Sequence, residues 1–122
     1  MTSGDLANIE SALGVTLPAS YRAAMLVYPL DSADANSQIA LRDDVKAVTA
    51  FNRFLREEFP GEWQPGYFAL GNSPSGDPYF LDLDAGSAAV WSWDHETHEV
   101  VREAQDFGSW LTVQRSLERG QR

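Results

Sequence analysis

The two histidines of the chain, His95 and His98, lie three positions apart within the segment DHETHE. On a helix, H-x-x-H spacing turns both rings to one side, where they can serve as a pair of zinc ligands. Here the segment is flanked by acids and is typical of a hairpin turn, and nothing fixes a third and a fourth ligand. We therefore expect a solvated turn and no metal ion at these histidines.

Asp82 and Asp84 form a second candidate pair. Their i, i+2 spacing on a strand places both carboxylates on one side, about 6–7 Å apart, a distance compatible with glycosidase chemistry. Alternating acids are, however, common on the solvent face of a sheet. The segment GNSPSGD at Gly71–Asp77 lacks the lysine and the helix start of a phosphate-binding loop. We therefore expect no catalytic residues, no cofactor and no enzymatic activity.

The first half of the chain has the apolar spacing of helices. The first helix has Leu6, Ile9 and Leu13 on its inner face, with Ser3 or Asp5 as its cap and Gly14 at its end. The second has Pro18 at its first position and Pro29 after its end, and its inner residues are Tyr21, Met25 and Tyr28. We expect a loop over 31–37 and a short edge strand at Gln38–Arg42 before the next helix.

A longer third helix follows, with Asp43 or Asp44 as its cap and Pro60-Gly61 at its end. Its expected apolar positions are Val45, Val48, Phe51 or Asn52, Leu55 and Phe59. A last helix begins at Asp106, and its expected core residues are Phe107, Trp110, Leu111 and Leu117.

Between these helices the sequence changes to short aromatic and β-branched runs separated by turn residues. The predicted strands are Tyr67–Leu70, Tyr79–Leu83, Ala89–Trp93 and Glu99–Glu103. Helices, then strands, then one closing helix predict a single α+β domain over residues 1–122. We expect a twisted antiparallel sheet of about four to six strands, with about four helices packed mainly on one side.

Alternation along the strands predicts which side chains share a face. Tyr79, Leu81 and Leu83 should pack under the helices, which leaves Phe80, Asp82 and Asp84 on the other side. Trp91 and Trp93 share a face opposite Val90 and Ser92, and either set suits the core. If the tryptophans face outward beside Asp82, they form an aromatic patch ringed by acids, which is typical of an interface.

The charge balance restricts the partners of the chain. Eighteen acids against nine bases give a net charge of −9. Such a field repels nucleic acid and anionic membrane surfaces and attracts cationic partners, although acidity also serves solubility. The chain contains no cysteine, and its first residues lack the basic and apolar features of a signal peptide. We expect a cytoplasmic protein; the composition does not set an oligomeric state.

Three motifs occur in a characteristic order. They are LGVTLPASYRAAML (Leu13–Leu26), with an LP-x-x-Y pattern; GNSPSGDPYFLDLD (Gly71–Asp84); and AVWSWDHETHEV (Ala89–Val100) followed by AQDFGSWL (Ala104–Leu111). Together they resemble the SUKH superfamily, which includes the yeast cell-wall assembly regulator family, over roughly residues 4–115. The loop before Gly76 departs from the pattern, because it contains Asn72, Pro74 and two serines where a glycine-rich stretch is commoner.

The resemblance implies a SUKH-like α+β immunity domain that inhibits a secreted or contact-delivered bacterial toxin by direct binding. The absence of a signal peptide favours a toxin that acts in the cytosol, and the acidic charge favours a basic toxin, such as a nuclease. The alternative is a non-catalytic regulatory or scaffold module of the same fold. The residues expected to contact the toxin lie on the loop and hairpin rims: Asp77, Asp84, Trp93, Asp94 and Glu96.

Overall fold

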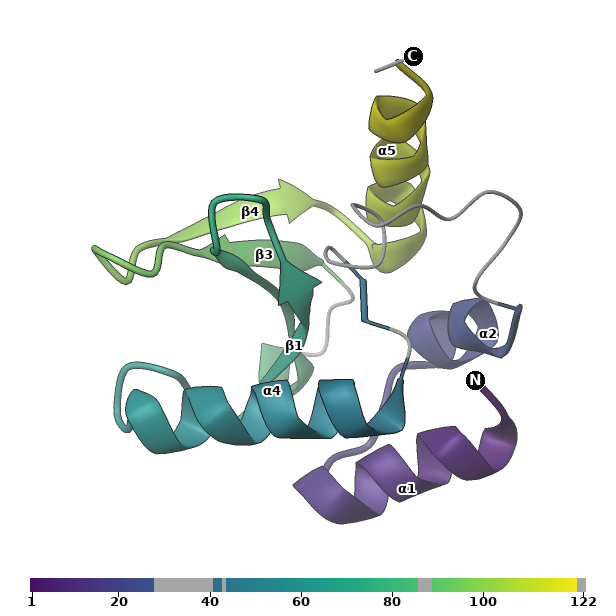
Figure 1. Ribbon diagram of the computed structural model, residues 1–122, viewed down its shortest axis with the longest axis horizontal. Coiled ribbons are helices and arrows are strands. Elements are labelled where there is room, and N and C mark those ends of the chain that lie inside the picture. The colour runs from purple at the N-terminus through teal and green to yellow at the C-terminus, as the bar shows by residue number, and fades with distance from the viewer. Residues whose placement is uncertain (28–40, 43, 86–88, 121–122) are drawn as a thin grey trace.

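The computed structural model describes residues 1–27, 41–42, 44–85 and 89–120, with side chains of the last helix described as far as Gln114 (Figure 1). The helices, in chain order, are α1 (Ser3–Leu13), α2 (Ala19–Val27), α4 (Val45–Glu58) and α5 (Phe107–Gly120). The strands are β1 (Tyr67–Asn72), β2 (Pro78–Asp82), β3 (Val90–Trp93) and β4 (Val100–Ala104), with a 3₁₀ turn, η1 (Leu83–Ala85), after β2. This arrangement confirms the predicted α+β class.

The helix ends follow the capping residues in the sequence. Thr2 caps α1, because its hydroxyl accepts a hydrogen bond from the Asp5 amide while the Asp5 carboxylate accepts one from the Thr2 amide. The expected cap at Ser3 or Asp5 was therefore wrong: Asp5 is the reciprocal partner. Gly14 ends the helix in the left-handed conformation, at φ 68°. At α4 the cap is Asp44, whose carboxylate accepts from the Ala47 amide.

The four strands form one antiparallel sheet in the order β1-β2-β3-β4. The expected strand bounds are confirmed to within two residues. Of the expected edge strand Gln38–Arg42, residues 38–40 lie outside the described residues, as do Tyr28, Pro29 and the loop over 31–37. Leu41 and Arg42 are not in a strand, although the Arg42 amide donates to the Leu70 carbonyl, 2.9 Å away.

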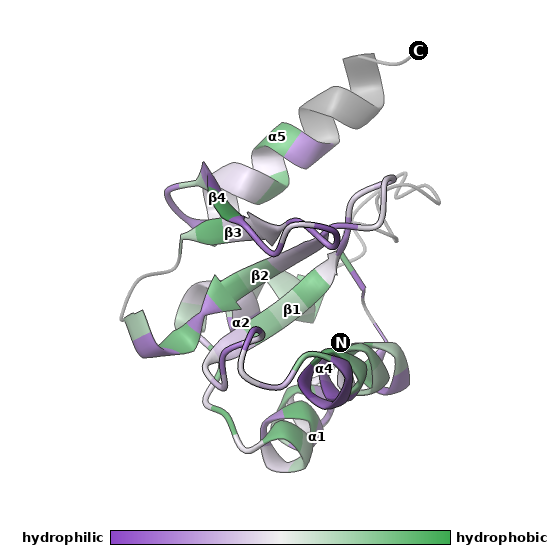
Figure 2. Ribbon diagram, turned by 90° about the vertical axis from the view of Figure 1, so that its left-hand side faces the viewer, coloured by the Kyte–Doolittle hydropathy of each residue, from purple (hydrophilic) through white to green (hydrophobic). Residues whose placement is uncertain are grey.

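One face of the sheet packs against α1, α2 and α5. Leu81 and Val90 are fully buried there, with Tyr79 and Leu83 partly buried beside them, as predicted for this face. The helices contribute Leu6, Ile9, Leu13, Tyr21, Met25, Phe107 and Trp110. Figure 2 shows α1 and α4 beside β1, with α5 beyond β4 and apolar colour along β1 and β2. Leu117 lies outside the described side chains.

The opposite face of the sheet carries a second, aromatic cluster. Its buried members are Leu55, Trp63, Ala69, Phe80 and Trp93, with Phe51, Phe59, Tyr67 and Trp91 partly buried around them. The ring of Trp63 lies edge-on to Phe80 and to Trp93, with centroids 5.3 and 5.6 Å apart. Of the two arrangements left open for β3, the structure places the tryptophans in this cluster, so the outward aromatic patch does not form, because the end of α4 and the turn after it cover that face.

Within the described part of the chain, no helix combines the length and the apolar character needed to cross a membrane. Likewise, no three histidine or acidic side chains in that part converge as a metal site would require.

Candidate protein-binding surface

The hairpin that joins β3 and β4 is shaped by Asp94. Its carboxylate accepts hydrogen bonds from the amides of Glu96 and Thr97, at 2.8 and 2.9 Å. The amide of His98 donates to the Asp94 carbonyl, and His98 adopts a left-handed conformation at φ 64°. The amide hydrogen bond from Thr97, followed by that from Glu96, holds the pKa of Asp94 below its ordinary value. The carboxylate therefore stays charged, and it fixes the turn that displays Glu96.

His95 connects this hairpin to the loop between β1 and β2. Its ring nitrogen Nδ1 lies 2.6 Å from Asp77 Oδ1, and its backbone amide donates to the same oxygen at 3.2 Å. The hydrogen bond to Asp77 raises the pKa of His95 above its ordinary value. On the other side of the ring, Nε2 lies 3.7 Å from the Glu96 carboxylate. The structure thus brings Asp77 and Glu96 together through one histidine, which directly follows Asp94 in the chain.

His98 connects the hairpin to the end of α4. Its Nδ1 lies 2.9 Å from the carboxylate of Glu62, in the turn that follows the helix. The imidazole stacks on Trp93 with centroids 4.6 Å apart and an interplanar angle of 6°, and Phe59 lies edge-on to it. The two histidines of the H-x-x-H motif therefore have separate carboxylate partners, on different elements.

Trp93 does not lie where a contact residue should. Only 1% of its surface is exposed, because it packs in the aromatic cluster between Phe59 and Trp63. It therefore supports the surface from beneath, by stacking on His98.

Asp84 lies apart from the other predicted site residues. Asp77 immediately precedes β2, whereas Asp84 lies in η1 beyond its other end, about 20 Å further along an extended chain. The Asp84 side chain packs against Gly66, where a Cβ atom would collide with its carboxylate. Because η1 ends the strand, the strand spacing assumed for an Asp82–Asp84 pair is wrong. Instead, the amide of Asp84 donates to the Asp82 carboxylate at 3.1 Å.

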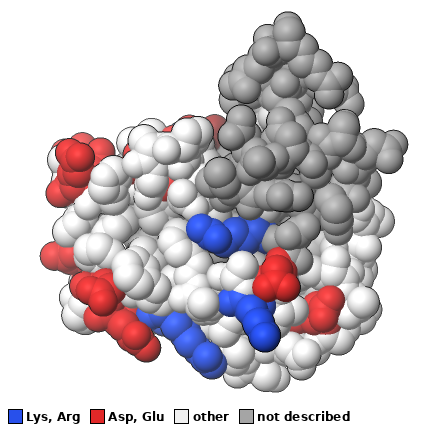
Figure 3. Space-filling model, viewed as in Figure 1, with Lys and Arg blue, Asp and Glu red and all other residues white. Residues whose placement is uncertain are grey.

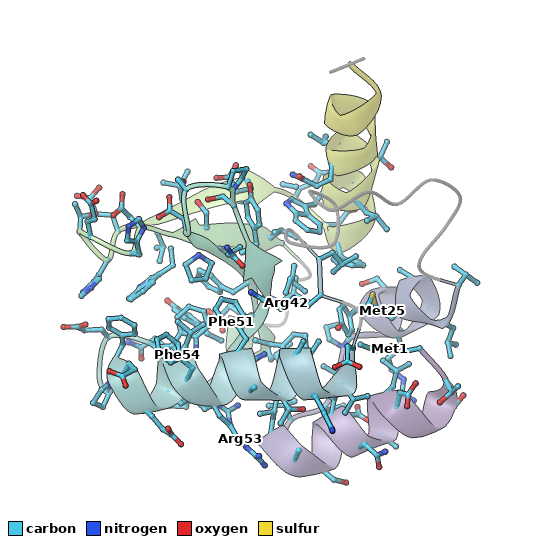
Figure 4. The ribbon with its side chains drawn as sticks, viewed as in Figure 1. Met1, Met25, Arg42, Phe51, Arg53 and Phe54 are labelled. Atoms are coloured by element: carbon cyan, nitrogen blue, oxygen red, sulfur yellow. The ribbon has the colours of Figure 1, made fainter. Side chains whose placement is uncertain are left out.

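One exposed aromatic residue, Phe54, was not among the predicted site residues. Phe54 lies on α4 with 51% of its surface exposed, although Leu55 beside it is buried. Figure 4 shows Phe54 and Phe51 on the side of α4 that faces the strands. The signal was present, since Phe54 falls outside the inward positions of α4, and Glu57 and Glu58 follow it on the last turn.

Charge is unevenly distributed over the face shown in Figure 3. Acidic side chains gather along the left of this view, where Figure 1 places the end of α4 and the β3–β4 hairpin. Lys and Arg lie toward the middle of this view. We call this acidic end the hairpin surface; its members are Phe54, Glu57, Glu58, Glu62, Asp77, Asp94 and Glu96.

The fold and this surface together define an acidic α+β domain with exposed carboxylates on a hairpin and an exposed aromatic ring on α4. Comparison with known families identifies it further. The chain belongs to the SMI1 / KNR4 family (SUKH-1), whose family model matches residues 1–113. No curated protein and no solved structure matched the chain.

Proposed function

We propose that this protein is an immunity protein that binds a bacterial toxin acting in the cytosol and inhibits it without catalysing a reaction. Membership in the SUKH-1 family supports a role of this kind. A net charge of −9 supports a basic toxin, and a nuclease is the class that most needs a basic surface, since it must hold phosphates. The observation that carries the proposal is the hairpin surface, which combines exposed carboxylates with the exposed ring of Phe54 on the last turns of α4.

Three carboxylates of this surface are held by partners within the protein. Asp77 is held by His95, Glu62 by His98, and Asp94 by two backbone amides. An interface built from side chains already in place loses less conformational entropy on binding. Glu96 is freer, with 79% of its side chain exposed, so it is the acid best placed to meet an approaching cation.

Phe54 contributes lasting affinity, which the exposed charges do not provide. Exposed carboxylates accelerate encounter and give selectivity, but they contribute little lasting affinity while water surrounds them. A half-exposed aromatic ring gains far more, because it loses its apolar surface to the partner and excludes water from the contact. We therefore assign the slow dissociation of the complex to Phe54 and the fast association to the acids. Inhibition follows if the covered part of the toxin includes its active site or substrate channel.

The test begins with the gene next to the one for this protein. If it encodes a toxin domain, co-expression should rescue growth and the two proteins should co-purify. Rescue with no stable complex would contradict direct inhibition. A complex with a host protein instead, without rescue, would favour a regulatory or scaffold module of the same fold.

The interface itself is tested by association kinetics at low salt. Reversal of Glu57, Glu58 and Glu96 to Lys should lower the association rate constant by about tenfold or more, and added salt should reduce the difference. Phe54→Ala should leave association nearly unchanged and raise the dissociation rate constant by about tenfold.

Asp84 offers a matched control at the other end of β2. We expect Glu96→Lys to slow association clearly more than Asp84→Lys, although each variant changes the net charge by the same amount. Equal effects would show that only net charge matters, and a larger effect from Asp84→Lys would move the interface to the η1 end.

A further inference from the structure

A pocket of about 510 Å³ opens between the end of α1 and the turn that follows α4. Its walls are mainly apolar, from Leu13, Val15, Pro60 and Pro65. Two side chains with N–H donors also line it, Arg56 and Trp63. Its volume lies within the range of roughly 300–1,000 Å³ that is usual for small-molecule sites. None of these residues belongs to the hairpin surface.

Only some of the N–H groups of the Arg56 guanidinium have hydrogen-bond partners. Its Nη1 donates to the Leu13 carbonyl at 2.9 Å, so one end of the guanidinium closes the C-terminus of α1. Its Nε is buried without a hydrogen-bond partner, and within the described residues no carboxylate pairs with this side chain. Nε and Nη2 form the edge of a guanidinium that receives both oxygens of a carboxylate. That edge is the part of Arg56 without a partner.

Trp63 carries a second donor without a partner. Only 3% of its surface is exposed, and its Nε1 has no acceptor among the described residues. An indole nitrogen can only donate, and a buried donor without an acceptor is rare in folded proteins. Its ring is fixed by edge contacts with Tyr67, Phe80 and Trp93, so the N–H has a defined direction.

We propose that this pocket binds a carboxylate carried on a small aliphatic group, either as a free acid or as the C-terminal residue of a peptide. The Nε–Nη2 edge of Arg56 receives the carboxylate, the indole N–H of Trp63 donates to a further oxygen, and the apolar walls enclose the aliphatic group. Both unpartnered nitrogens are covered by neighbouring atoms, so the entering carboxylate displaces the side chain of Arg56 and the turn residues beside Trp63, whose ring keeps its place in the aromatic cluster. This binding is independent of the proposed toxin inhibition.

The probe for this site is N-acetyl-L-leucine, titrated into the ¹⁵N-labelled full chain. We expect saturable shifts of the Arg56 Nε–H and Trp63 Nε1–H signals, with a dissociation constant of about 1 mM or tighter. N-acetyl-L-leucinamide, which lacks the charge, should bind at least about tenfold more weakly. The free acid 4-methylpentanoate distinguishes the sources: equal binding indicates a free acid, and weaker binding indicates a peptide terminus. Either result supports the site.

Three variants complete the experiment. Arg56→Gln should weaken binding of N-acetyl-L-leucine by about tenfold or more, and Trp63→Phe by about threefold with the fold retained. Arg53→Gln is the matched control, because Arg53 donates to the neighbouring Ala12 carbonyl from outside the pocket, and it should bind as the natural protein does. Signals that do not move, or equal binding of the acid and the amide, would overturn the proposal.

Discussion

The two edge strands of the sheet, β1 and β4, differ in how far other residues cover them. Along β1, the amide group of Asn52 takes the place of a neighbouring strand: its Oδ1 accepts from the Ala69 amide at 2.7 Å and its Nδ2 donates to the Ala69 carbonyl at 3.1 Å. At the next residue of β1, the backbone amide of Arg42 donates a hydrogen bond to the Leu70 carbonyl. Along β4, by contrast, Val100 and Val101 are 43% and 57% exposed, and no further strand pairs there among the described residues.

We infer from this difference that the β1 edge contributes mainly to folding stability, whereas the β4 edge contributes mainly to partner recognition. The β1 edge is closed by a fully buried polar side chain, so it belongs to the cooperative core. The β4 edge and its hairpin are joined to the rest of the site largely by exposed histidine–carboxylate contacts, which contribute little to folding but determine where the acids lie. We therefore expect substitutions at the β1 edge to change the free energy of unfolding, and substitutions at the hairpin to change its local geometry.

The largest effect should come from Asn52→Leu. This change removes both hydrogen bonds to Ala69 and leaves a backbone N–H and a backbone C=O buried without partners. We expect the free energy of unfolding to fall by about 3 kcal/mol, measured by urea denaturation. Ser92→Ala, which removes an exposed hydrogen bond to Glu103 near the open edge, should cost less than about 0.5 kcal/mol. Similar losses for both variants would contradict the contrast between the edges.

A smaller effect is expected from the tryptophans of β3, which share the aromatic face. Trp93 is buried and Trp91 only partly so. Trp93→Leu should cost about 2 kcal/mol, and Trp91→Leu less than about 1 kcal/mol, in the same denaturation measurement. Trp93→Leu should also shift the His98 ring resonances, because it removes the stacked indole. If Trp91→Leu costs more, Trp91 rather than Trp93 is the core residue of this strand.

Most of the fold was predictable because local signals agree with tertiary packing. Apolar spacing located α1, and Gly14 located its end through its left-handed conformation. The alternation along β2 assigned Leu81 and Tyr79 to the face under the helices. The sequence did not predict which residues cover the opposite face of the sheet, where Phe80 and Trp93 lie. Trp63 lies in no regular element, and only its long-range contacts with Phe80 and Trp93 show that it closes that face.

The candidate site was predictable only in part, for the same reason. The acidic residues of the turn predict a hairpin, and the structure has Asp94 and Glu96 in that hairpin. The contact between Asp77 and His95 joins residues 18 positions apart and depends on how the two loops meet. Asp84 was grouped with Asp77 because both lie in the motif Gly71–Asp84. In the structure these two aspartates lie beyond opposite ends of β2.

The smallest expected effect is a pH dependence of the hairpin. Asp77 raises the pKa of His95 above its ordinary value of 6.5, so the folded state binds this proton more tightly than the unfolded state does. The stabilisation from the pair is therefore fully present below pH 6.5 and is lost as the pH rises through the raised pKa. An NMR titration of the His95 ring measures this pKa directly.

Asp77→Asn is the matched control, because it keeps the size of the side chain and removes its charge. In this variant we expect the His95 pKa to return toward 6.5, and the pH dependence of stability above pH 6.5 to weaken. Identical titration midpoints in the natural protein and the variant would mean that the Asp77–His95 contact does not persist in solution. The loop carrying Asp77 and the hairpin carrying Glu96 would then move independently, and the acids of the hairpin surface would not be ordered in advance of a partner.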